Sequence, residues 1–362
     1  MRRSNPERAH CSRVVAASLA LIAAVVVLAA SAIVFFGCRG RESRNRDKVV
    51  IGLSIATDTF IIERWNKDIK IFTGAARDRG ADVIVQLSAG GTKEQIAQID
   101  FLLARGIDVL VVIPHDSEML SGIVRKARDA KVPVIAYDRL VMGTPIDAYV
   151  SFDNHEVGRL MAKALRAAVP RGRYLIVNGS KRDNNSYIVR EGLWEVLGPA
   201  IARKEISIVD EIWLDEWSSD EALMRIGAVL DRTTNIDAIS CANDQIAGAA
   251  IQLLSEYRLA GKVAVVGQDA DISACQKIVE GTQLMTVYKP LARLAERAAD
   301  IAVSVALGNV PPPDLTVDNG SGTPIPYYVE PPYAVTRDNI DELVIRDGFH
   351  SAEDVYRNAA DR

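Results

Sequence analysis

After residue 48 the chain alternates short apolar runs with longer segments whose apolar residues recur at helical spacing. Val49–Ile55 predicts a buried strand, because it is short and almost wholly apolar. The next segment, Ile62–Arg79, predicts a helix with Ile69 and Phe72 on one face. This strand-then-helix order recurs along most of the chain and is the main signal of its fold.

The same pattern predicts further strands at Val83–Leu87, Val109–Ile113, Val132–Tyr137, Tyr174–Val177, Ile206–Trp213, Ala238–Cys241, Val263–Val266 and Met285–Tyr288. Helices are expected from Thr92, as N-cap, to Gly106 and at Ser117–Ala130, His155–Val169, Asn185–Leu197, Asp220–Leu230, Gln245–Leu254, Ile272–Glu280 and Pro290–Leu307. Apolar strands alternating with helices predict parallel sheets covered on both faces. The expected fold class is therefore α/β, doubly wound, and 362 residues are enough for two domains.

The N-terminus has a different pattern. Four arginines precede a charge-free run, Val14–Gly37, which ends immediately before Cys38. Two hypotheses fit: an export signal with Cys38 as the lipid-modified cysteine of a bacterial lipoprotein, or a retained transmembrane anchor. Arg39–Lys48 is then a charged tether. In both cases the remainder of the chain leaves the cytoplasm and stays attached to the membrane of the cell envelope.

Composition narrows the function. Charged residues make up 25% of the chain and the net charge is −4, so there is no basic field to hold nucleic acid. No nucleophile elbow, phosphate-binding glycine loop or metal-binding histidine spacing occurs, which argues against an enzyme, a resident metal or a cofactor. Cys241 and Cys275 fit two buried small hydrophobes, with a disulfide as the alternative.

Polar residues follow the predicted strands at the ends where open parallel sheets bind ligands. They are Asp138, Arg139, Asp183, Asn185, Asn243, Gln268, Asp269 and Lys289. Carboxylates that accept from hydroxyls, together with cations and carboxamides, match a sugar ligand. The alternative for Asp183 and Asn185 is a helix cap, and for Lys289 a plain strand end.

Sugars also pack their C–H faces on aromatic rings, and the chain has four tryptophans. Trp65 and Trp217 are the candidates for stacking, with a place in the core as the alternative for each. Trp194 and Trp213 lie within periodic segments and are expected in the core. The proline-rich stretch 311–322 is expected to be a crossing between domains.

Several stretches closely resemble the D-xylose-binding branch of the periplasmic binding proteins that serve bacterial ABC sugar transporters. They include Glu63–Asp68, Ala136–Arg139, Val150–Asn154, Asp183–Asn185, Asn243–Asp244, Gly267–Asp271, Met285–Pro290 and Val344–His350. The resemblance covers nearly all of residues 49–350. It implies a type I fold of two α/β lobes joined by three crossovers, with the sugar between them.

Carried over by position, the resemblance implies two kinds of sugar contact. Hydrogen bonds would come from Arg64, Lys67, Asp138, Arg139, Asp183, Asn185, Asn243, Asp269 and Lys289. Trp65 and Trp217 would stack on the sugar. The long N-terminal segment, Cys241 and Cys275 depart from the family pattern and put free release into the periplasm in doubt.

The expected organisation is a signal or anchor over 1–37, a tether over 38–48 and two lobes. The first lobe takes 49–154 and about 290–320, the second takes 155–289 and about 321–350, and 351–362 is a tail. The leading hypothesis is a monomeric receptor that passes D-xylose to an ABC permease. The alternatives are a sugar sensor that engages a membrane histidine kinase or chemoreceptor, a repressor, which would need an N-terminal DNA-binding helix pair, and an enzyme.

Overall fold

The computed structural model describes residues 48–57 and 62–358. Contacts divide the chain into two units, Met1–Asp47 and Lys48–Arg362, and all of the described residues belong to the second. Val14–Gly37 and Cys38, on which an export signal, anchor or lipid site was predicted, lie outside the described residues. Among the residues that are described, no helix combines the length and the apolar character needed to cross a membrane.

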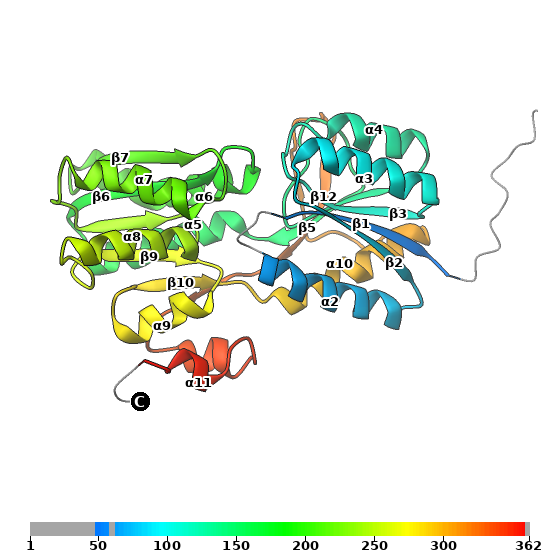
Figure 1. Cartoon of the computed structure of the whole chain (residues 1–362). Coiled ribbons are helices and arrows are strands. Elements are labelled where there is room, and N and C mark those ends of the chain that lie inside the picture. Colours follow the sequence, from blue (N-terminus) through cyan, green and yellow to red (C-terminus); the bar gives the residue numbers. More distant parts are fainter. Residues whose placement is uncertain (1–47, 58–61, 359–362) are drawn as a thin grey trace, which may run out of the picture. The chain divides into compact units, whose positions relative to one another are not determined.

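From β1 to α10 strands and helices alternate as the sequence predicts, except that β5 follows β4 directly (Figure 1). The sequence did not predict β5 or the consecutive strands β11, β12 and β13. The strands are β1 (Val50–Ala56), β2 (Asp82–Ser88), β3 (Val109–Ile113), β4 (Val134–Tyr137), β5 (Ala148–Phe152), β6 (Gly172–Ser180), β7 (Ile206–Leu214), β8 (Ala238–Cys241), β9 (Ala264–Gln268), β10 (Met285–Tyr288), β11 (Leu315–Val317), β12 (Ile325–Glu330) and β13 (Tyr333–Val335). The helices are α2 (Ile62–Asp78), α3 (Thr92–Arg105), α4 (Ser121–Asp129), α5 (Asn154–Ala168), α6 (Asn184–Ala202), α7 (Ser219–Leu230), α8 (Asp244–Glu256), α9 (Ile272–Glu280), α10 (Leu291–Ala306) and α11 (Ala352–Val355). A π-helical turn covers Asp341–Ile345.

The first sheet has seven strands in the order β11-β12-β5-β4-β3-β1-β2, all parallel except for the β11–β12 pair. The interior strand β3 is buried on both faces, because Val109 and Val111 contact the core under α2 and α10. Leu110 and Val112 contact the opposite core under α3 and α4. Figure 1 shows these helix pairs on the two faces. We call this sheet and its four helices the first lobe.

The second sheet has six strands in the order β13-β10-β9-β8-β6-β7, and only β13 runs antiparallel. Helices α7 and α8 cover one face and α5 and α6 the other (Figure 1). This sheet, α5–α9 and α11 form the second lobe. Cys241 and Cys275 are buried here as free cysteines, so the structure favours two small hydrophobes over a disulfide. Burial raises the pKa of both thiols and keeps them protonated.

Two glycines bring α5 and α6 into close contact. A Cβ at Gly158 would lie 1.9 Å from the Val189 carbonyl oxygen, and one at Gly192 would lie 1.9 Å from that of His155. No other residue fits at either position without moving backbone. This packing fixes α6, whose N-terminus carries part of the candidate site.

The chain passes between the sheets three times, after β5, after β10 and after β12. The third passage differs from the expected one near residue 321, because β12 adds to the first sheet beside β5. Residues 311–322 therefore stay in the first lobe and are not the crossing. Pro331 and Pro332 make the crossing instead, since proline has no N–H to continue a strand.

Two other expectations need correction. Thr92 is the first helical residue of α3 and Gly91 is its N-cap, while Gln95 is buried and bonds the Ile113 carbonyl oxygen at 2.8 Å. Residues 351–358, which were expected to form a tail, are part of the second lobe. Helix α11 packs on α9 and buries Val355.

Candidate functional site

A buried polar cavity lies where strand ends of both sheets meet. Its volume is about 30 Å³. It is lined by Asp138, Arg139, Asn154, Asp183, Asn185, Trp217, Asn243, Gln268, Asp269 and Lys289. Of the expected site residues whose side chains are described, the structure thus brings together all except Lys67.

The first lobe supplies Asp138 and Arg139, which directly follow β4. Asp138 is in the left-handed region with φ of 62°. Its carbonyl oxygen accepts from the Ser151 hydroxyl at 2.7 Å, the Tyr149 hydroxyl at 3.0 Å and the Asn185 carboxamide at 3.0 Å. These three donors, two from the first lobe and one from the second, hold the turn in a conformation that is uncommon for residues other than glycine.

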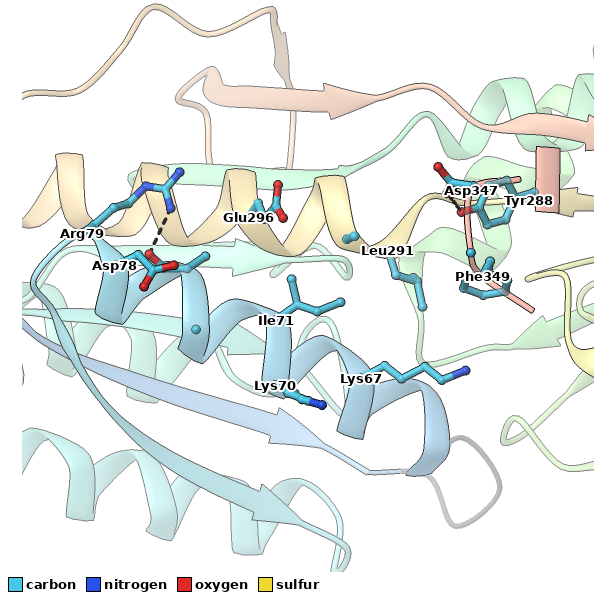
Figure 2. Close-up of a pocket in the computed structure, with 14 residues that line it drawn as sticks. Lys67, Lys70, Ile71, Asp78, Arg79, Tyr288, Leu291, Glu296, Asp347 and Phe349 are labelled. Carbon is cyan, nitrogen blue, oxygen red and sulfur yellow. Dashed lines mark hydrogen bonds between the residues drawn. The ribbon is translucent and has the colours of Figure 1, made fainter. Parts of the chain in front are cut away.

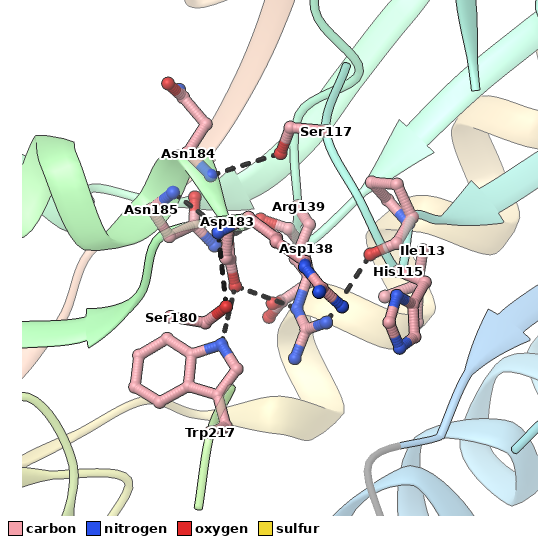
Figure 3. A network of polar contacts seen from close by, with 12 residues as sticks. Ile113, His115, Ser117, Asp138, Arg139, Ser180, Asp183, Asn184, Asn185 and Trp217 are labelled. Carbon is pink, nitrogen blue, oxygen red and sulfur yellow. Dashed lines mark hydrogen bonds and ion pairs between the residues drawn. The ribbon is translucent and has the colours of Figure 1, made fainter. Parts of the chain in front are cut away.

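An ion pair joins the lobes in the cavity wall. The Arg139 Nε lies 2.9 Å from Asp183 Oδ2, and the two side chains are only 5% and 3% exposed. Asp183 also accepts from the Asn185 backbone N–H at 2.9 Å and from Trp217 Nε1 at 3.1 Å (Figure 3). Burial raises the pKa of Asp183, although Arg139 and both donors act in the opposite direction. The buried charges of Asp183 and Arg139 are tolerated because each has an oppositely charged partner and Asp183 has two further hydrogen-bond donors.

Trp217 is both a cavity residue and a packing residue. A Cβ on Gly179 would lie 2.2 Å from the ring, so glycine is required for this approach. The half-buried ring also packs against the core under α7 and α8. The two alternatives from the sequence, stacking and core, therefore do not exclude each other.

A second charge pair, formed by second-lobe residues, lies at the ends of β9 and β10. Lys289 Nζ is 2.6 Å from Asp269 Oδ1 and donates to Gln268 Oε1 at 3.0 Å. The Gln268 amide in turn donates to the Ala242 carbonyl oxygen at 2.5 Å. Asp269 has φ of 100°, so this turn is also conformationally unusual.

The carboxamides of Asn243 and Asn185 also make hydrogen bonds within the protein. Asn243 Oδ1 caps α8 by accepting from the Ile246 N–H at 2.9 Å. Asn185 bonds Asp138 across the lobes and accepts from the Tyr149 hydroxyl at 3.3 Å. The expected cap role of Asp183 is real too, since it caps α6 while it faces Arg139.

Sequence reasoning did not assign two polar residues of this region to the site. Gln268, the last residue of β9, was already among the strand-end residues expected to bind the ligand. Asn154 lies at the start of α5 and bonds the Ser151 hydroxyl at 3.4 Å. Asp244 lies behind the cavity, fully buried, and accepts from the Thr286 hydroxyl at 2.7 Å.

Burial, together with the nearby Asp271 and Asp269, raises the pKa of Asp244 well above its usual value. Its oxygens also accept from the Gln283 amide at 2.9 Å and from the Asp271 N–H at 3.0 Å. Asp244 therefore braces the strand ends that carry Asp269 without lining the cavity.

Lys67 lies elsewhere. It lines a larger groove of about 680 Å³ between α2, α10 and residues 347–349 (Figure 2), which we call the helix groove. Its Nζ is 5.4 Å from the centre of the Phe349 ring. Arg64 and Trp65 belong to α2, but their side chains are not among those described, so their roles stay predictions.

Trp194 and Trp213 are only half-buried, contrary to the expectation of core positions. The Trp194 ring lies 5.0 Å from the Arg190 guanidinium, and the Trp213 ring lies 4.6 Å from the Tyr187 ring. Both sit under side chains at the surface of the second lobe. Helical or strand periodicity locates the apolar face but does not reveal how much of it is covered.

Two covered α/β sheets whose strand ends meet at a buried cavity of paired charges define a ligand-binding protein, since ligands bind beyond the carboxyl ends of such strands. A family model described as a periplasmic binding protein domain matches residues 54–309. The chain belongs to this family, whose members bind solutes and are not enzymes.

Relatives are similar over nearly the whole chain. The D-xylose-binding periplasmic protein of Haemophilus influenzae is 43% identical over 316 residues, which cover 87% of this chain and 94% of that protein. The protein of the same name from Escherichia coli is 43% identical over 309 residues, covering 85% and 93%. A carbohydrate transporter solute-binding protein of Chloroflexus aurantiacus, solved with D-glucose, is 28% identical with a TM-score of 0.80 and covers 85% and 98%.

Proposed function

We propose that the chain is an extracytoplasmic receptor that captures D-xylose between its lobes and delivers it to an ABC permease. The observation that carries this proposal is the 43% identity, over most of the chain, to two proteins named for D-xylose binding. The buried cavity of paired carboxylates and cations supports it, because such groups match vicinal hydroxyls.

Within the cavity we assign two kinds of contact. The two paired carboxylates, Asp183 and Asp269, keep oxygens that can accept from sugar hydroxyls, while Arg139 and Lys289 donate to hydroxyl or ring oxygens. Asp138, Asn185 and Asn243 complete the polar set. The Trp217 ring offers an aromatic surface for the apolar face of the sugar.

Calorimetric titration of the full chain with a panel of sugars tests this proposal. We expect D-xylose to bind at micromolar affinity or better, about −8 kcal/mol or stronger, and more tightly than ribose, arabinose or glucose. Glucose is the informative comparison, because the solved Chloroflexus relative holds it. Tighter binding of glucose would refute the choice of sugar, and no binding of any sugar would refute the receptor function.

We also propose that the receptor acts in the periplasm while tethered to the membrane, through a lipid on Cys38 or through the apolar segment that precedes it. Membrane fractionation of the wild type and of Cys38→Ala tests the anchor. Loss of maturation in the variant supports the lipid, and unchanged membrane association supports the segment. Recovery of the wild type entirely in the soluble periplasmic fraction would refute both.

A further inference from the structure

Ser117 makes direct contacts between the lobes just outside the cavity. It lies in the loop between β3 and α4 of the first lobe. Its backbone N–H donates to the Arg182 carbonyl oxygen at 3.0 Å, and its hydroxyl oxygen accepts from the Asn184 N–H at 3.1 Å. Figure 3 shows the second of these bonds beside the Arg139–Asp183 pair. Both partners belong to the second lobe and flank Asp183 in sequence.

The loop that carries Ser117 is fixed from within its own lobe. Asp116 Oδ1 accepts from the N–H groups of Glu118 and Met119 at 2.9 and 3.0 Å. The Ser117 carbonyl oxygen accepts from the Met142 N–H at 2.7 Å, and Ser117 is only 4% exposed. Its hydroxyl is therefore presented to the second lobe by a rigid loop.

The contact completes a helix N-terminus that the second lobe leaves incomplete. The first N–H groups of a helix have no acceptor within the helix. At the start of α6, Asp183 satisfies the N–H of Asn185, while the Asn184 N–H bonds Ser117 of the other lobe. Separation of the lobes would leave this N–H to water.

We propose that Ser117 is a positioning residue for sugar binding, which holds Asp183 from outside the cavity and stabilises the lobes in contact. This inference rests on the proposed function and adds a residue that does not line the cavity. The two bonds fix the peptide on each side of Asp183, so its carboxylate meets Arg139 and the sugar in one orientation. Opening of the cavity must break both bonds, so their loss acts mainly on sugar release.

Ser117→Ala in the full chain tests the proposal, because alanine removes the hydroxyl acceptor and keeps the backbone donor. We expect the D-xylose Kd to rise about three- to tenfold, the range for losing one neutral hydrogen bond, mainly through faster dissociation in stopped-flow fluorescence. In the sugar-bound protein, hydrogen exchange across residues 181–186 should be faster. Ser117→Thr, which keeps a hydroxyl, should restore slow release, and Ser121→Ala at the start of α4 is the matched control.

A purely structural role predicts a different result. A lower Tm of the ligand-free Ser117→Ala protein, with unchanged dissociation rate and unchanged exchange at 181–186, would overturn the proposal. If the wild type binds no sugar of the panel, the proposed function fails separately. In that case, hydrogen exchange across residues 181–186 is compared between the ligand-free wild type and ligand-free Ser117→Ala. Faster exchange in the variant supports the contact between the lobes, and equal exchange overturns it.

Discussion

The buried cavity and the helix groove differ in the environment of their charges as well as in size. In the cavity, Arg139 and Lys289 are almost fully buried and each has a carboxylate within 3 Å. The groove is the larger hollow, yet Lys70 and Glu296 on its rim are exposed to water. Volume alone would therefore favour the groove as the sugar-binding site, whereas the burial of paired charges favours the cavity.

The physical reason lies in the free energy of desolvation. A buried ion costs several kcal/mol unless partners compensate it, so a protein keeps such groups only where they are fully bonded. Partners that already fix a carboxylate also preorganise it for a ligand. Lys70 and Glu296 in the groove are instead exposed to water, which solvates their charges without ordering them. Substitutions in the cavity should therefore change sugar affinity far more than substitutions in the groove.

The largest effect is expected for Asp269→Ala. Lys289 would lose its carboxylate partner while keeping its hydrogen bond to Gln268, and sugar hydroxyls would lose an acceptor. We expect D-xylose binding to weaken by about 2 to 4 kcal/mol in calorimetry. Glu296→Ala, which removes an exposed carboxylate of the helix groove, is the control and should bind as the wild type does. Equal losses in the two variants would contradict the contrast.

Trp217→Ala should weaken both binding and stability. The variant loses the stacking surface, the hydrogen bond to Asp183 and packing on the second-lobe core. We expect a loss of about 1 to 2 kcal/mol in D-xylose binding and about 2 kcal/mol in the free energy of unfolding.

Trp213→Ala is the matched control for Trp217→Ala, because Trp213 is half-buried in the same lobe but lies outside the cavity lining. It should lose stability and keep its affinity. Thermal melts with and without D-xylose separate the two, since bound ligand raises the Tm by mass action. If D-xylose raises the Tm of Trp217→Ala as much as that of the wild type, the Trp217 ring does not contribute to sugar binding.

Asp244 supplies a pH test of the buried wall. Its pKa is raised in the folded protein above the usual 3.8, so the folded state binds a proton before the unfolded state does as pH falls. Between these two pKa values the wild type should therefore gain stability relative to Asp244→Asn on acidification, by at most about 1.4 kcal/mol per pH unit. Urea unfolding of both proteins across that range measures the difference. A constant difference would show that the pKa is not raised.

The smallest effect is expected for Lys67→Ala. The resemblance to xylose-binding proteins implies a sugar contact for Lys67, whereas the structure places it beside Phe349 in the helix groove. If the groove takes no part in binding, D-xylose affinity should change less than twofold, and the ligand-free Tm should change little. A tenfold loss of affinity in calorimetry would return Lys67 to the site.

Sequence reasoning went furthest where local pattern and topology coincide. Apolar runs located β3, β8 and β10 to the residue, because strands buried on both faces are continuous in sequence. Polar residues at the ends of such strands, among them Asp138 and Asp269, then had to converge, since parallel strands end at the same edge. Most of the cavity lining follows from this rule.

Sequence reasoning failed where the local pattern of apolar and polar residues was weak or ambiguous. The short edge strands β11 and β13 carry little pattern, and the proline cluster at 311–313 predicted a crossing that Pro331 and Pro332 actually make. Prolines mark where a strand cannot continue, but only pairing decides which of two proline clusters leaves the sheet.

The sequence by itself determined the α/β class, the order of elements and the charged residues at the strand ends, since these depend on residues close together in the chain. Only the tertiary structure decided which of those residues share a cavity and which, like Lys67, face another hollow. It also decided that Ser117 reaches Asn184, 67 positions away. Such contacts depend on how the two lobes pack against each other, and the hydrophobic periodicity of one lobe contains no information about the position of the other.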